Sequence, residues 1–188
     1  FNCLNDDIKP DEGTFNMIEE KNVRPLTIDD IGYVLSTPTV PEFLTGREFL
    51  KFFLEINEGK IKDIKSIDEY FDFMKIEEED RDKLLKDYSH GMKNKMQMLI
   101  NIIANPNILL LDEPLTSLDV VVAEEMKEML KSIKKEHILI FSTHIMDLAL
   151  SLCDEIVILK NGTLSLVDNK LKREQLKDKI IEMLREDE

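Results

Sequence analysis

The chain has 188 residues, 43% of them hydrophobic and 34% charged, which fits a soluble globular domain and excludes a disordered chain. Its 39 acidic and 25 basic residues give a formal net charge of −14, which excludes a broad basic face for nucleic acid. Two cysteines, Cys3 and Cys153, are too few for a disulfide scaffold, and we expect both to be core thiols.

The first 35 residues are predicted to contain two strands. Residues 1–4 resemble the last turns of a helix, and residues 14–18 form a strand. The polar residues 22–30 are predicted to be a loop. The apolar run from Ile31 to Leu35 is the second strand, and Ser36 and the prolines that follow end it.

Residues 45–104 are predicted to be mostly helical. Capping boxes at Thr45 and Ser66 begin two helices, each followed by an apolar face. A charged helix is expected over residues 78–86. Ser89 caps a further helix, whose methionine, leucine and isoleucine residues recur at helical spacing and are expected to face the core.

The last third of the chain alternates strands and helices, which is typical of a parallel sheet. Ile108 to Leu111 is an unbroken apolar run, as expected for a strand covered on both faces. The later elements are a helix capped by Asp119 that runs to 134, a strand over 138–141, a helix over 145–153, a hairpin over 155–167 that turns at Asn161-Gly162, and a helix over 171–185.

Polar side chains follow both buried strands. Asp112 and Glu113 come directly after the first, and His144 comes shortly after the second. The acids could form a solvated turn, or they could form a ligand site, because ligands bind at the carboxyl ends of strands in such sheets. One carboxylate could hold Mg²⁺, and the other could deprotonate a water. The histidine could bind a transferred phosphoryl group, so the arrangement suits phosphoryl transfer.

Four motifs, in this order, resemble the nucleotide-binding subunit of ABC transporters over nearly the whole chain. Tyr88 to Met92 stands where that family has its signature, Ile108 to Pro114 is similar to its Walker B strand, Thr116 to Asp119 to its D-loop, and Ser142 to His144 to its switch loop. The signature matches at Ser89 and Gly91 but departs at His90 and Met92.

The resemblance assigns roles to these residues. It implies that Asp112 serves Mg²⁺, Glu113 is the catalytic base, and His144 is the switch histidine. Ser89 and Gly91 would contact the γ-phosphate of ATP held by a second subunit. The other nucleotide contacts it implies are Asp119, in the loop that links the two ATP sites, and Ser36, which stands where the family has a glutamine.

The phosphate-binding P-loop is the largest departure, because no Gly-x-x-x-x-Gly-Lys-Ser/Thr occurs in the chain. In the family, the helix after the P-loop leads into a segment similar to residues 1–13. We therefore expect the chain to be a piece of a longer ATPase that lacks the first strands and the P-loop, and to be inactive alone.

The resemblance implies an α/β fold, namely the RecA-like core of P-loop NTPases with a mostly parallel sheet and an inserted helical subdomain. Residues 1–188 would be one incomplete domain, with the helical subdomain over 42–105, the core sheet over 106–168 and a C-terminal helix over 169–188. The implied partners are a membrane-spanning permease and a second ATP-binding subunit, at the cytoplasmic face of the membrane. Leu44 to Leu50 and the signature are most similar to bacterial drug or antibiotic exporters.

Two other functions remain open. A degenerate ABC-like module could serve dimerisation or regulation without catalysis; Ser36, His90 and the absent P-loop favour it, whereas the Walker B acids, Asp119 and His144 oppose it. A soluble ABC ATPase acting on ribosomes or DNA is disfavoured by the acidic charge and by the absence of twin domains, a basic linker or a long coiled coil.

Overall fold

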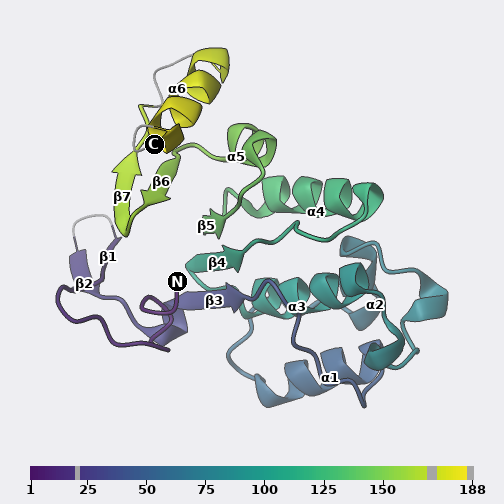
Figure 1. The fold of residues 1–188 in the computed structure, drawn as a ribbon. Helices are drawn as coiled ribbons and strands as arrows, with labels where there is room; N and C mark the ends of the chain where they lie inside the picture. The colour runs from purple at the N-terminus through teal and green to yellow at the C-terminus, as the bar shows by residue number, and fades with distance from the viewer. Residues whose placement is uncertain (20–21, 169–172, 186–188) are drawn as a thin grey trace. The chain divides into compact units, whose positions relative to one another are not determined.

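The computed structural model describes residues 1–19, 22–168 and 173–185. The chain divides into two compact units, Phe1–Ser142 and Thr143–Glu188, each of which is described by itself (Figure 1). The elements of the first unit are β1 (Asn16–Glu19), β2 (Asn22–Pro25), β3 (Ile31–Val34), α1 (Gly46–Ile56), α2 (Ile67–Phe73), α3 (His90–Ala104), β4 (Ile108–Asp112), α4 (Val120–Ile133) and β5 (Ile138–Ser142).

A parallel sheet of β3, β4 and β5 forms the centre of the first unit, with β4 in the middle. The arrows of the three strands run side by side in the same direction in Figure 1. Leu109, Leu110 and Leu111 of β4 are fully buried, which confirms the strand predicted from its unbroken apolar run. On β5, by contrast, Ile138 and Ile140 are exposed although the strand is apolar.

The prediction of a loop over residues 22–30 was wrong. Residues 22–25 form β2, which pairs antiparallel with β1, and a 3₁₀ helix follows at Ile28–Asp30. Of the residues in the hairpin strands, only Met17 is buried. A two-stranded ribbon with this little burial accepts polar residues along its length, so its sequence has no strand-like alternation.

The charged helix predicted over residues 78–86 was also wrong, because two short 3₁₀ helices, Glu78–Asp80 and Leu85–Asp87, occupy this region. Backbone groups here bond to the segment before α1 and to its first turn. Leu85 N–H donates to Leu44 O at 2.8 Å, and Arg47 N–H donates to Arg81 O at 2.9 Å. These long-range bonds replace the bonds that an α-helix would make within itself.

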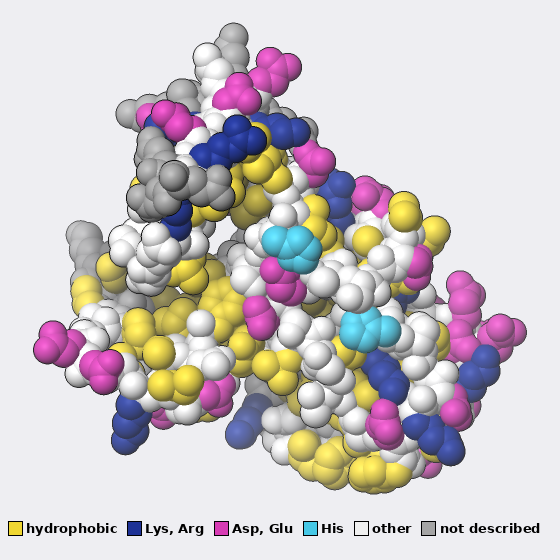
Figure 2. All heavy atoms as spheres, viewed as in Figure 1, with side chains coloured by type: hydrophobic (Ala, Val, Ile, Leu, Met, Phe, Trp, Pro, Cys, Tyr) yellow, Lys and Arg dark blue, Asp and Glu magenta, His cyan; other side chains and the backbone are white. Residues whose placement is uncertain are grey.

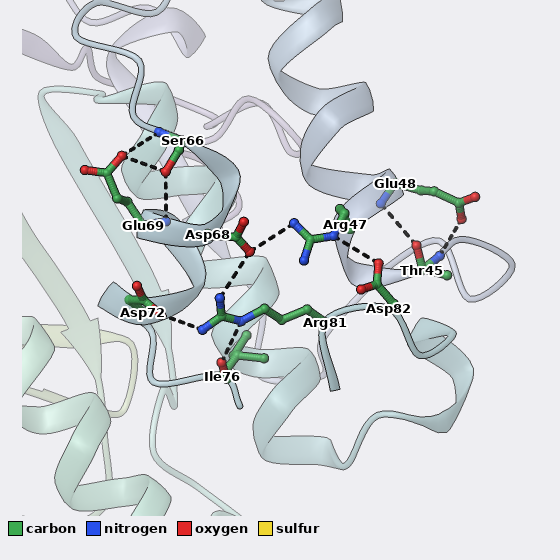
Figure 3. A network of polar contacts seen from close by, with 10 residues as sticks. All are labelled: Thr45, Arg47, Glu48, Ser66, Asp68, Glu69, Asp72, Ile76, Arg81 and Asp82. Atoms are coloured by element: carbon green, nitrogen blue, oxygen red, sulfur yellow. Dashed lines mark hydrogen bonds and ion pairs between the residues drawn. The ribbon is translucent and has the colours of Figure 1, made fainter. Parts of the chain in front are cut away.

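Arginine–carboxylate contacts join the helices of the predicted helical subdomain (Figure 3). Asp68 Oδ1 accepts from Arg47 at 3.0 Å and from Arg81 at 3.1 Å. Both guanidinium groups lie over the buried ring of Phe71, at 5.8 and 5.4 Å from its centroid. The capping boxes predicted at Thr45 and Ser66 are confirmed and start α1 and α2.

The second unit contains α5 (Met146–Leu152), the hairpin β6 (Val157–Lys160) and β7 (Thr163–Leu166), and α6 (Arg173–Arg185). Ile158, Val167 and Ile180 form its core. The hairpin turns at Asn161 and Gly162, both with positive φ, as predicted. The first two residues of the predicted last helix, 171 and 172, lie outside the described residues.

Two further expectations at the N-terminus were wrong. Residues 1–4 form turns rather than the end of a helix, with Asn5 N–H donating to Phe1 O at 3.0 Å. Cys3 is exposed, so it is not a core thiol; Cys153 is half-buried. None of the helices in the described part of the chain is long and apolar enough to cross a membrane.

Asp30 ties the β1–β2 hairpin to the start of β4. Its carboxylate accepts two bonds of 2.6 Å from Arg24, and it accepts a further bond from Asn107 at 3.1 Å. The backbone and hydroxyl of Thr27 donate to it as well. Asp30 is only 6% exposed, and its bonds, those from Arg24 first, hold its pKa well below the ordinary value.

We therefore expect Asp30→Asn to lower the free energy of unfolding at pH 7 by about 2 kcal/mol, less than for a fully buried pair because Arg24 is partly exposed. A carboxyl with a lowered pKa stabilises the fold above its unfolded value of about 3.9 and loses that contribution as pH falls through the folded value. In urea titrations the difference in free energy of unfolding between the wild type and Asp30→Asn should therefore shrink below about pH 4.

The exposed neighbour Asp29 provides the control, since Asp29→Asn should change the free energy of unfolding by less than about 0.5 kcal/mol. A constant difference from pH 7 to 3 would contradict the role assigned to Asp30.

Candidate functional site

A hydroxyl joins the neighbouring strands β4 and β5 at the edge where they end. Asp112 is in register with Ser142, the last residue of β5. Ser142 Oγ donates to Asp112 Oδ1 at 2.6 Å and accepts from the backbone N–H of Glu113 at 3.0 Å. One side chain therefore fixes the Asp112 carboxylate and the backbone of the next acid.

Glu113 is held in an unusual conformation. Its φ is +48°, in the left-handed region that residues other than glycine rarely adopt. Thr116 closes the turn that follows Glu113. Its backbone N–H donates to Glu113 O at 3.1 Å, and its Oγ1 donates to Glu113 Oε2 at 2.8 Å. Strained backbone of this kind is common at functional sites. Both acids are half-buried and hydrogen-bonded, which favours the ligand-site hypothesis over a solvated turn.

The sequence did not identify Ser142 and Thr116 as partners of the two acids. A signal for Ser142 was present, because two adjacent parallel strands of equal length bring their last residues side by side. Thr116 offered only the weaker signal of a hydroxyl three residues after the acid, a spacing that closes many turns.

Asp119 caps α4, as predicted, and its Oδ1 accepts from the backbone N–H groups of Val121 and Val122, each at 3.0 Å. Ser89 caps α3 in the same way, with its Oγ accepting from Met92 N–H at 3.2 Å. The nucleotide contacts of Asp119 and Ser89 stay predictions.

Gly91, in the first turn of α3, packs directly against α4. A Cβ placed on Gly91 would lie 3.0 Å from Val122 Cγ1, so a larger residue would require the Val122 side chain to shift. The structure thus brings the starts of α3 and α4 together, and it gives Gly91 a packing role beside its predicted phosphate contact.

The two remaining predicted residues lie just beyond the strands. Ser36 is exposed in a bend two residues after β3, and His144 is exposed two residues after β5, in the second unit. Their roles in nucleotide binding and catalysis stay predictions. His137 is buried before β5, and its Nδ1 lies 2.7 Å from Pro106 O, which fits a structural residue.

Among the described residues, no group of three or more His, Cys, Asp or Glu side chains could hold a metal ion. Mg²⁺ usually takes one or two carboxylates and completes its shell with water and phosphate oxygens. Asp112, whose Oδ1 is oriented by Ser142, fits such a single-carboxylate site, so its fit depends on phosphates bound nearby.

A cavity of about 190 Å³ lies away from these residues, between α3, α4 and the end of α2. None of the predicted site residues lines it. The hydrogen bonds at the end of β4 therefore define the candidate site better than the cavity does.

Comparison with known proteins agrees with the motifs. Residues 1–116 match the family model described as ABC transporter. An uncharacterized ABC transporter ATP-binding protein of Bacillus subtilis, YxlF, is 33% identical over 160 residues, covering 84% of this chain and 52% of the relative. A similarly described protein of Methanocaldococcus jannaschii, MJ1023, is 38% identical over 117 residues, covering 61% of this chain and 44% of the relative. The chain thus spans about half the length of these curated relatives.

The fold has a solved counterpart in the ATP-binding cassette MJ0796, which was determined as a dimer in a post-hydrolysis state with ADP and Pi. The TM-score is 0.69 at 20% identity, over 87% of this chain and 76% of that one. The predicted P-loop NTPase fold is confirmed by this similarity. Together with the family match over residues 1–116, it shows that the chain belongs to the ABC transporter family and forms part of its ATP-binding domain.

Proposed function

We propose that this chain is part of an ATPase subunit that powers the movement of a solute across a membrane. The observation that supports it most directly is the cluster at the end of β4, where Ser142 orients Asp112 and the backbone of Glu113. An acid fixed beside a second acid at the carboxyl end of a buried parallel strand suits nucleotide hydrolysis.

Glu113 is the proposed general base. Its carboxylate accepts a proton from a water whose oxygen forms a bond to the γ-phosphorus of ATP. The bond from that phosphorus to the bridging oxygen breaks, which leaves ADP and phosphate. Thr116 orients the carboxylate through its 2.8 Å bond to Oε2, and His144 is proposed to hydrogen-bond the transferred phosphoryl group.

Asp112 is the proposed ligand of Mg²⁺, with Ser142 holding the carboxylate in place. When bound there with phosphate oxygens and water, Mg²⁺ would neutralise the charge of the phosphates. Ser89 and Gly91 are proposed to contact ATP held by a second ATP-binding subunit, and Ser36 and Asp119 to contribute to the same shared sites.

The chain is proposed to be a piece of a longer ATPase whose P-loop is supplied by a preceding segment. Its six glycines include no Gly-x-x-x-x-Gly-Lys-Ser/Thr, and the chain spans about half the length of its curated relatives. The exposed, apolar residues of β5 support this proposal, since such a strand normally has a further neighbour.

The proposed partners are a membrane-spanning permease and a second ATP-binding subunit, at the cytoplasmic face of the membrane. Hydrophobic side chains gather over α1 in Figure 2, where Phe52 and Ile56 are exposed on the helix and Phe43 precedes it. An apolar surface of this kind suits a protein partner. The drug or antibiotic exporter type stays a prediction, and the net charge of −14 gives no support to a nucleic-acid partner.

The 188-residue chain alone should bind Mg-ATP only at millimolar concentrations or more weakly, because the backbone cradle for the phosphates is missing. Isothermal titration of the chain, beside a longer protein that adds a P-loop ahead of Phe1, would measure this. The longer protein should bind in the micromolar range. Micromolar binding by the short chain would contradict the proposal that it lacks the phosphate site.

In the P-loop-containing protein, Glu113→Gln should lower the rate of ATP hydrolysis by about 100-fold or more, because the amide cannot accept the proton from water. Glu124→Gln, on the exposed face of α4, is the matched control and should leave the rate within about twofold. If the protein were a noncatalytic ABC-like module, the P-loop-containing wild type and both variants would hydrolyse no ATP. Hydrolysis by the wild type therefore separates the ATPase hypothesis from the noncatalytic one.

A further inference from the structure

We propose that Gln97 is a positioning residue that fixes the loop carrying Ser36 onto α3, the helix that Ser89 caps. Its amide contacts both ends of this loop. Gln97 Oε1 accepts from Thr39 N–H at 2.7 Å, and Nε2 donates to Leu35 O in a longer contact of 3.4 Å. The residues between, including Ser36, are otherwise exposed or half-buried.

Gln97 is 4% exposed, and a buried amide of this kind is costly unless its donor and acceptor are satisfied. Both groups are used, one at each end of the loop. Losing the side chain would therefore remove both attachments at once.

Neighbouring residues on the same face of α3 continue the attachment at helical spacing. Lys93, four residues before Gln97, pairs with Glu42 at 2.7 Å. Asn101, four residues after it, approaches β3 so closely that a Cβ on Gly32 would lie 2.9 Å from its Oδ1. Residues at i and i+4 share a helix face, so one face of α3 holds β3 and the segment that follows it.

Other residues of α3 contact α4. Lys95, whose side chain is 6% exposed, pairs with Glu125 at 2.7 Å, and Gly91 packs against Val122. The loop is thus joined through α3 to the helix that Asp119 caps. One consequence rests on the proposed function. If the Ser36 loop moves during the ATPase cycle, Gln97 would transmit that movement through α3 to the motifs at Ser89 and Asp119.

Hydrogen exchange followed by NMR on the 188-residue chain tests this without nucleotide. In Gln97→Met, which keeps the length of the side chain but loses both bonds, the Thr39 amide should exchange at least 10-fold faster relative to the buried Leu110 amide. The Met92 amide, which donates to Ser89 Oγ, should exchange at least threefold faster on the same scale.

The matched control is Asn57→Leu, which removes another side-chain amide bond, from Asn57 Nδ2 to Phe53 O in α1; it should leave both exchange ratios unchanged. Equal acceleration of Thr39, Met92 and Leu110 in Gln97→Met would mean a general loss of stability and would overturn the proposal. Acceleration of Thr39 without Met92 would overturn the link to Ser89. Failure of the ATPase proposal would leave these exchange ratios as expected.

Discussion

Leu109, Leu110 and Leu111 have no exposed surface, and their burial constrains the rest of the first unit. A strand buried on both faces needs a partner on each edge, which β3 and β5 provide. Because the three strands are parallel and in register, their carboxyl ends come together at one edge of the sheet. Asp112, the last residue of β4, therefore lies beside Ser142, the last residue of β5. The position of the acidic site thus follows from the burial of the apolar residues of β4.

The helix α3 carries a second constraint, since it buries polar residues where an ordinary amphipathic helix buries apolar ones. Asn94, Lys95 and Gln97 are all buried, and in the described part of the chain no buried side-chain polar atom lacks a partner. Lys95 bonds to both Glu125 and Lys75 O. Such bonds have few alternative arrangements, so they favour one position of α3 against its neighbours more strongly than apolar contacts do.

Much of this fold was predictable where the signal was local. The apolar run at β4 and the caps at Ser89 and Asp119 each depend on a few consecutive residues, and all were predicted correctly. The strand β2 was missed because its residues are partly polar and mostly exposed. The region 78–87 was missed because distant backbone groups decide its structure, such as Leu44 O for Leu85 N–H. The acids of the site were found for the same local reason, whereas their partner Ser142 lies 30 residues from Asp112 in sequence.

The pairing of β3 with β4 has a kinetic consequence. Residues 35–107, which include α1, α2 and α3, lie between the paired strands. Bringing the ends of a chain together costs more entropy as the flexible segment between them lengthens, and distant contacts slow folding. The capped helices, tied to one another by Arg47, Asp68 and Arg81, shorten that flexible segment when they form first. The helical insertion therefore helps determine how quickly the sheet can assemble.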